Sequence, residues 1–238
     1  MKRIQAASSP FALARRALLK RLAALGLLGP AGLAGLIQEA LAKGDMPKVS
    51  SIYFLEGTVT VNGSEAKVGT PVKAGDRIET GKKDSRAVVY FEGDAFLLRE
   101  HTNIELKGKS TGLDLVNVVG GKLLSVFGKR RAERTLTVRV QSATIGIRGT
   151  GMYLEAGDKR TYFCLCYGEA AIEGAGMAEP RVVNTKHHEM PLFLDDSGGS
   201  MKVEKGTVIN HTDDELIMLE ALCGREPPFK DIPFSNRY

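Results

Sequence analysis

The chain has 238 residues and a formal net charge of +5, from 33 Lys and Arg against 28 Asp and Glu. Residues 1–42 hold six of the basic residues and one acid, so the remaining 196 residues carry 27 of each sign and no net charge. The basic balance therefore belongs to the N-terminal segment, and a nucleic-acid-binding domain is excluded. Tryptophan is absent and aromatic residues make up only 6%, which argues against a carbohydrate-stacking surface.

Residues 1–42 have the organisation of an export signal. A basic region that includes Arg15 and Arg16 precedes an apolar stretch over residues 22–37, and the small-x-small pattern ALA ends at Ala42. The order RRALLK resembles the twin-arginine export signal. The apolar stretch is about 16 residues long, and a membrane-spanning helix needs roughly 20. We therefore expect cleavage after Ala42 and a periplasmic mature protein. The alternative is an inner-membrane anchor formed by residues 22–42, the one part of the chain that then contacts the membrane.

Beyond residue 42, apolar residues alternate with a period of two. More than a dozen short strands are predicted, separated by turn signals such as Asn62-Gly63 and Gly93-Asp94. No strand–helix alternation follows, so a doubly wound nucleotide-binding fold is excluded. The pattern predicts an all-β fold. Its strands form a multi-stranded antiparallel sandwich or roll, or a β-helix-like domain, with an N-terminal signal helix and one short C-terminal helix.

The order of strands and turns carries a resemblance. The most specific pieces are AGDRIETG at residues 74–81 and ATIGIRGTGMYLE at residues 143–155, within a series that spans roughly residues 50–175. This series resembles the FecR-domain family, the periplasmic β module of iron-dicitrate-type sigma-factor regulators. The resemblance implies a FecR-like β domain over residues 43–175, and we expect a C-terminal β extension over residues 176–238 to pack on it.

The same resemblance suggests a function in the cell envelope. It implies an exported binding or scaffolding module that acts in protein–protein interaction or signal sensing, with a protein or an envelope component as its partner. About 14 residues precede the arginine pair, too few for a folded cytoplasmic domain. A membrane-anchored regulator of sigma-factor signalling is therefore an alternative and not the main prediction. A second alternative is a periplasmic metal-binding or metal-sensing protein that uses the Cys164/Cys166 and His187/His188 pairs.

Two local features have structural interpretations. Thr212-Asp213-Asp214-Glu215 has the spacing of a capping box and is followed by apolar residues and Gly224, which predicts a short helix over residues 212–223. Arg148 is the one charged residue in an otherwise apolar strand. We expect it to pair with a nearby carboxylate, such as that of Asp76 or Glu92.

The residues with the greatest chemical potential lie in the last third of the chain. Cys164 and Cys166 are two positions apart on a predicted strand, so both thiols face the same side. His187 and His188 follow. These four residues could bind a transition metal such as zinc, copper or iron, because thiolate and imidazole are ligands for those ions. Only one of the two histidines can join the thiols unless the segment forms a turn. In the alternative, one cysteine of the pair forms a disulfide with Cys223.

Catalysis has little support in the sequence. The chain has no Gly-x-Ser-x-Gly elbow, no His-Glu-x-x-His motif and no phosphate-binding loop. We therefore expect no catalytic residues and a protein that is not an enzyme.

Overall fold

The computed structural model describes residues 49–109, 111–129 and 136–229, all within the compact unit Pro47–Tyr238. The predicted export signal, with Arg15, Arg16 and the cleavage site after Ala42, lies outside the described residues, as does the alternative anchor over residues 22–42. Within the described ranges, no helix has the length and apolar character that a membrane span requires.

The described residues form two sheets, which we call sheet A and sheet B. Sheet A contains β1 (Ser51–Glu56), β5 (Arg86–Phe91), β6 (Asp94–Leu98), β11 (Gly151–Ala156), β14 (Pro191–Asp195) and β15 (Lys202–Lys205). Sheet B contains β2 (Val59–Val61), β3 (Ser64–Glu65), β4 (Arg77–Thr80), β7 (Asn103–Lys109), β9 (Leu136–Arg139), β10 (Thr144–Ile147) and β13 (Arg181–Thr185). All described strand pairs are antiparallel except the pair of β9 with the strand β8 described next.

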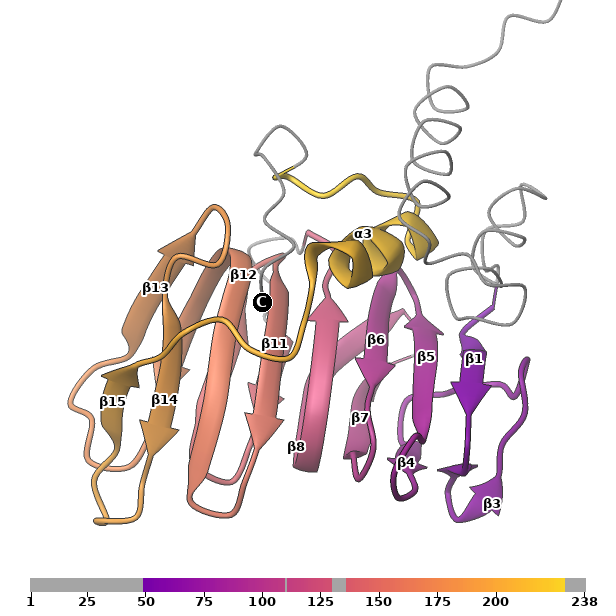
Figure 1. Cartoon of the computed structure of the whole chain (residues 1–238), viewed down its shortest axis with the longest axis horizontal. Helices are drawn as coiled ribbons and strands as arrows, with labels where there is room; N and C mark the ends of the chain where they lie inside the picture. The colour runs from indigo at the N-terminus through magenta and orange to yellow at the C-terminus, as the bar shows by residue number, and fades with distance from the viewer. Residues whose placement is uncertain (1–48, 110, 130–135, 230–238) are drawn as a thin grey trace, which may run out of the picture. The chain divides into compact units, whose positions relative to one another are not determined.

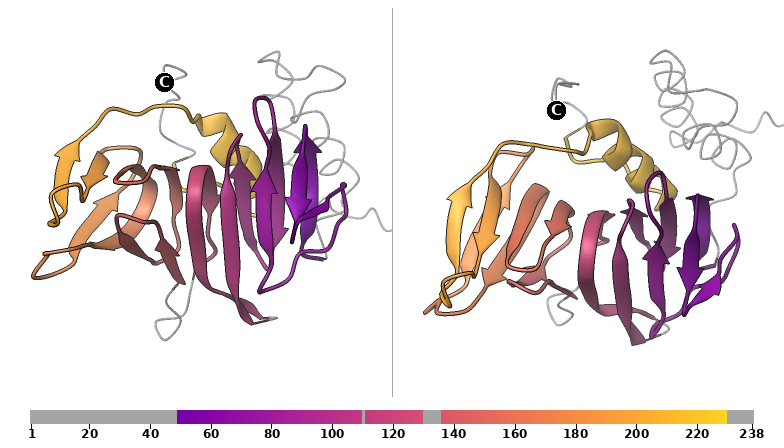
Figure 2. Two further views of the ribbon diagram at one scale, coloured as in Figure 1. Left: turned by 90° about the horizontal axis from the view of Figure 1, so that it is seen from below. Right: turned by 60° about the horizontal axis from the view of Figure 1, so that its bottom comes forward.

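Two long strands, β8 (Gly112–Val126) and β12 (Arg160–Glu173), belong to both sheets. Each changes sheet at a glycine with a positive φ, +98° at Gly121 and +95° at Gly168. A side chain at Gly121 would place its Cβ 2.3 Å from the Cα of Thr102. Glycine therefore allows both the backbone conformation and the close approach at this corner. The two shared strands join sheets A and B into one β assembly, antiparallel except for the pair of β8 and β9 (Figures 1 and 2).

The main core lies between the two sheets. Phe96 and Phe163 of sheet A and Ile104 and Ile172 of sheet B are all part of one buried apolar cluster. Residues in alternate positions of sheet A point to its opposite face, which we call the outer face. That outer face is also buried in part, because the chain returns across it after β15 (Figure 1).

The returning chain, residues 206–229, is named the C-terminal cover. It contains α3 (Asp213–Leu222), which contacts β6 and β8. Thr212 caps α3: its hydroxyl accepts a hydrogen bond from the backbone N–H of Glu215, whose side chain accepts one from the backbone N–H of Thr212. The predicted helix and its capping box are thus confirmed, with the helix proper between the cap residues Thr212 and Cys223.

The structure confirms the all-β prediction with one short C-terminal helix in the described chain. The prediction for the partner of Arg148 was wrong. Its guanidinium lies 3.3 Å from the carboxylate of Glu169, not against Asp76 or Glu92. The antiparallel register of β10 and β12 sets this pairing, since Ile147 lies opposite Ala170 and the next residues along the pair are Arg148 and Glu169.

Candidate metal centre

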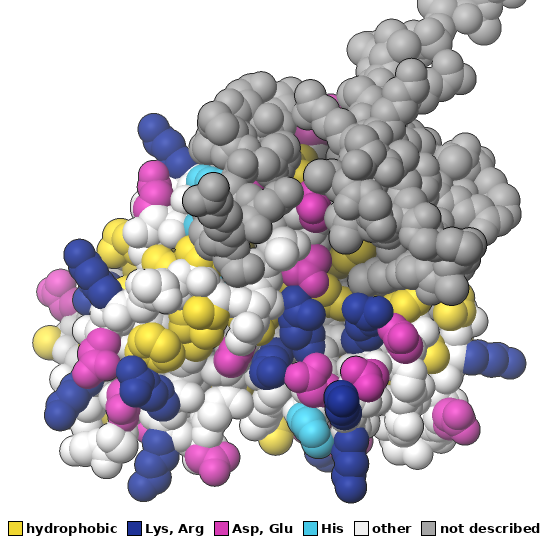
Figure 3. Space-filling model, in the orientation of Figure 1, with side chains coloured by type: hydrophobic (Ala, Val, Ile, Leu, Met, Phe, Trp, Pro, Cys, Tyr) yellow, Lys and Arg dark blue, Asp and Glu magenta, His cyan; other side chains and the backbone are white. Residues whose placement is uncertain are grey.

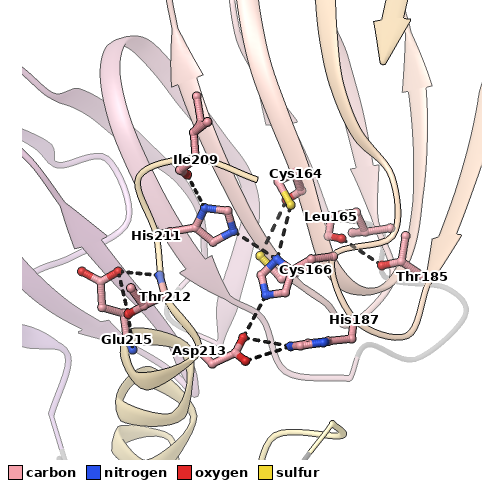
Figure 4. A network of polar contacts seen from close by, with 11 residues as sticks. Cys164, Leu165, Cys166, Thr185, His187, Ile209, His211, Thr212, Asp213 and Glu215 are labelled. Atoms are coloured by element: carbon pink, nitrogen blue, oxygen red, sulfur yellow. Dashed lines mark hydrogen bonds and ion pairs between the residues drawn. The ribbon is translucent and has the colours of Figure 1, made fainter. Parts of the chain in front are cut away.

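The two thiols lie on the outer face of sheet A. In β12, Phe163 and Leu165 point into the core between the sheets, so Cys164 and Cys166 point the other way. Both cysteines are nevertheless fully buried. The C-terminal cover and the loop between β13 and β14 lie over them and bring histidines to the same place (Figure 4).

His188 and His211 complete a cluster of four with the thiols. The ligand atoms of Cys164, Cys166, His188 and His211 all lie within 4.8 Å of one another, and all four residues are buried. His188 comes from the loop before β14, and His211 comes from the C-terminal cover just before α3. Three separate segments of the chain therefore meet at this cluster.

The spacing suits a tetrahedral metal ion. The Sγ of Cys164 lies 3.5 Å from Nδ1 of His188, and that Nδ1 lies 3.2 Å from Nε2 of His211. Metal–ligand bonds of about 2.3 Å to sulfur and 2.0–2.1 Å to nitrogen place tetrahedral ligand atoms about 3.3–3.8 Å apart. Because all four ligand atoms lie within 4.8 Å of one another, side-chain movements of about 1 Å would bring the remaining pairs to this spacing.

The imidazole nitrogens that face away from the cluster have hydrogen-bond acceptors. Nε2 of His188 lies 3.0 Å from the Oδ1 of Asp213, and Nδ1 of His211 lies 2.6 Å from the backbone oxygen of Ile209. In the neutral imidazole, which is the form that binds a metal, each acceptor favours the tautomer with its proton on the outward nitrogen and a lone pair on the nitrogen that faces the cysteines. Metal-binding histidines in proteins are usually held in this way.

The electrostatics of the cluster favour a thiolate. The hydrogen bond from Cys166 and those from His188 and His211 lower the pKa of Cys164 well below its ordinary value, against the opposing effect of burial. Burial lowers the pKa of His188, but hydrogen bonds to Asp213 and Cys164 outweigh it and raise that pKa to about 9. Burial raises the pKa of Cys166, where the proximity of Cys164 acts in the same direction. A metal ion binds the thiolate form, which the surroundings of Cys164 already stabilise.

The structure separates the two predicted histidines. His188 joins the thiols, whereas Nε2 of His187 lies 2.9 and 3.0 Å from the two carboxylate oxygens of Asp213. The predicted set of Cys164, Cys166, His187 and His188 thus differs from the observed cluster, in which His211 takes the fourth place. His187, His188 and Asp213 form a second group with metal-ligand atoms, but their hydrogen-bonding distances suit a carboxylate that holds two imidazoles.

Cys223 belongs to different surroundings. Burial raises the pKa of this thiol to about 12, with Arg225, Glu220 and Asp94 as its charged neighbours. No disulfide is present among the three cysteines, which all lie in the described part of the chain. The alternative of a bond from Cys223 to Cys164 or Cys166 is therefore not what this structure shows.

Cys164, His188 and Asp213 also have the order of a nucleophile, a base and an orienting acid. The exposed fraction is 0% for Cys164, 6% for His188 and 3% for Asp213. A nucleophile must reach its substrate, and the thiol of Cys164 is fully buried.

Both apolar and charged side chains lie on the surface over the rest of sheet A. Figure 3 shows apolar side chains gathered over β12 and β14, and Lys, Arg, Asp and Glu interspersed over β6 and β8. Basic side chains pair with acidic ones here, as Lys122 does with Glu100 and Arg160 with Glu204. On this face, the described residues thus form no extended basic surface of the kind that binds nucleic acid.

The chain matches no known protein-family model and no curated protein. Among solved structures it is similar to two crystal structures, at 1.65 and 2.50 Å resolution, of a protein from Parabacteroides distasonis ATCC 8503 described as "a putative anti-sigma factor". Each has a TM-score of 0.45 and 13% sequence identity, over 55% of this chain and 60% of that one. This chain thus matches less than two thirds of that protein's length. At this level a shared function does not follow, and the resemblance to the FecR-domain family stays a prediction.

Proposed function

We propose that this chain is a zinc-binding protein of the cell envelope, with one zinc ion held by Cys164, Cys166, His188 and His211. The observation that carries the proposal is the arrangement of the two imidazoles. Each turns one nitrogen toward the buried thiols and has its other nitrogen at an acceptor, Asp213 for His188 and Ile209 for His211. Packing alone does not require that orientation of both rings.

Charge favours a divalent ion such as zinc over a cuprous ion at two thiolate and two imidazole ligands. Two thiolates carry two negative charges, which a divalent zinc ion neutralises. A cuprous ion leaves one negative charge in a site with no exposed ligand, and a buried uncompensated charge is costly. Zinc also adopts the four-coordinate tetrahedral geometry that the spacing of the cluster suits.

A site with four protein ligands leaves no position for a substrate or a reactive water. Such closed zinc sites stabilise structure, whereas catalytic sites keep one position open. The burial of all four ligands supports the same distinction. We therefore propose a structural or sensory zinc site in a protein that is not an enzyme.

The metal content of the purified full chain tests the proposal. The wild-type chain should hold about one zinc ion per molecule by inductively coupled plasma mass spectrometry. The Cys164→Ser/Cys166→Ser variant should hold almost none, because it lacks both thiolates. Cys223→Ser is the matched control, since it removes a thiol outside the cluster and should keep the zinc. Equal zinc in the wild type and in the double variant contradicts the proposal.

Location and partner form the second part of the proposal. The predicted export signal with Arg15 and Arg16 and the FecR-like motifs support an exported module that binds a protein or another envelope component. A zinc site suits this location, because coordination protects paired thiolates from oxidation in a compartment where disulfides form. A twin-arginine route carries folded proteins, so it is compatible with metal loading before export.

A further inference from the structure

The proposed zinc ligands come from three segments of the chain that pack against one another. Cys164 and Cys166 belong to a central strand of sheet A, whereas His211 belongs to the C-terminal cover. His188 lies between them, and its other nitrogen contacts Asp213, the first residue of α3. A metal ion at this point connects sheet A, the loop before β14 and the start of α3 (Figure 4).

The first half of the cover, residues 206–215, has weak attachments apart from this cluster. Asn210 donates a hydrogen bond to Glu155 and accepts one from Arg99, and both contacts lie at the exposed edge of the cover. The Arg99–Glu215 ion pair is partly solvated, with side-chain exposures of 23% and 22%. Bonds of this kind contribute little net stability, because water replaces them when they open.

Apart from the hydrogen bond that the Tyr162 hydroxyl donates to the backbone oxygen of Thr207, the buried attachments of this half pass through the cluster. His211 is 1% exposed, and its ring stacks on Tyr153 with centroids 4.5 Å apart. Its Nε2 faces His188, and Asp213, which is 3% exposed, contacts both His187 and His188. Without a metal ion, imidazole contacts and a weak thiol contact are what hold these buried groups together.

The second half of the cover, residues 216–229, has anchors of its own. Leu216, Leu219 and Leu222 of α3 are fully buried. Beyond the helix, the guanidinium of Arg225 bonds to Glu220 and to the backbone oxygen of Gly93 in the turn between β5 and β6. None of these contacts involves the four ligands.

On the basis of the proposed zinc site, we propose that zinc occupancy controls the first half of the C-terminal cover. Loss of zinc opens residues 206–215 and the His187–His188 loop, while residues 216–229 stay on sheet A. The opening uncovers the outer face of β11 and β12 around Tyr153 and the two thiols. We call this arrangement a metal-dependent latch: bound zinc holds residues 206–215 on sheet A, and loss of zinc releases them while the rest of the β fold stays intact.

Hydrogen–deuterium exchange of the full chain, with mass spectrometry of its peptides, tests the latch. The zinc-loaded chain is compared with the chain after chelation and after zinc is restored. Amides of the opening segments that are bonded in the structure, such as those of Gly206, His188 and Thr212, should exchange at least about tenfold faster without zinc. Peptides from residues 220–225, whose amides are bonded to carbonyls within the second half of the cover, should change little, and restored zinc should reverse the effect. Cys164→Ser/Cys166→Ser should behave as the chelated chain even with zinc present.

The outcomes separate the latch from the zinc site itself. If one zinc ion binds and the exchange of residues 206–215 does not change, the latch is overturned and the zinc site stands. Faster exchange throughout the described sheets on chelation also overturns the latch, because that result is global destabilisation. If no zinc binds to the wild-type chain, both proposals are overturned.

Discussion

Zinc is expected to raise the thermal midpoint of the metal-free chain by roughly 5–10 °C when free zinc is a hundredfold above its dissociation constant. A ligand that binds the folded state alone then adds about 2.7 kcal/mol of stability. For a folded domain of about 200 residues, each 1 kcal/mol raises the midpoint by about 2–4 °C. The four ligands lie on three segments that are far apart in the sequence, so the unfolded chain cannot hold them in this arrangement.

Circular dichroism during heating measures this effect. Cys164→Ser/Cys166→Ser should show no rise with zinc, because the remaining imidazoles cannot complete the site. Cys223→Ser should keep the full rise, since its thiol lies in the Arg225–Glu220 surroundings. An equal rise in the wild type and the double variant would show that zinc acts elsewhere on the chain.

Glu220→Ala is expected to destabilise the fold by about 3 kcal/mol, the lower end of the range for breaking a buried ion pair. The side chain of Glu220 is 4% exposed, and its Oε2 lies 2.5 Å from Nε of Arg225. Its other carboxylate oxygen accepts a hydrogen bond from the hydroxyl of Tyr167. Removal of the carboxylate takes away the charged partner of the guanidinium and the acceptor of a buried tyrosine hydroxyl.

The surface pair of Arg86 and Glu56 is the matched control. Its atoms lie 2.6 Å apart, nearly the same distance, but the side chains are 40% and 50% exposed. Glu56→Ala should therefore cost less than about 1 kcal/mol. Urea denaturation measures the free energy of unfolding of both variants. Equal losses would contradict the account, because the difference between the pairs is their burial and the additional bond to Tyr167.

The elements of the fold could be predicted because their signals are local. Alternation with a period of two marks strands such as β1 and β9, and the capping box of Thr212 and Glu215 marks the start of α3. The passage of β8 and β12 through both sheets could not be predicted. It depends on which strands pair on either side of Gly121 and Gly168, and pairing between distant segments leaves no local pattern.

The candidate metal centre could likewise be predicted only where its signal is local. The spacing of Cys164 and Cys166 on a strand places both thiols on one face, and the structure has this arrangement. Sequence reasoning chose the adjacent His187 and His188, although His211 occupies the fourth place. His211 lies 45 residues beyond Cys166 and reaches it only because the cover crosses the outer face of sheet A. The available signal was its position next to the predicted helix cap, which places it in a segment that is fixed at one end.

Zinc K-edge X-ray absorption of the purified, zinc-loaded chain identifies the metal ligands themselves. We expect two sulfur ligands at about 2.3 Å and two nitrogen ligands at about 2.0–2.1 Å, with the outer-shell scattering of two imidazoles. His211→Asn should lose one imidazole, whereas His101→Asn, which replaces an exposed histidine outside the cluster, should leave the spectrum unchanged. A shell of nitrogen and oxygen without sulfur would contradict the assignment of the metal centre to Cys164, Cys166, His188 and His211.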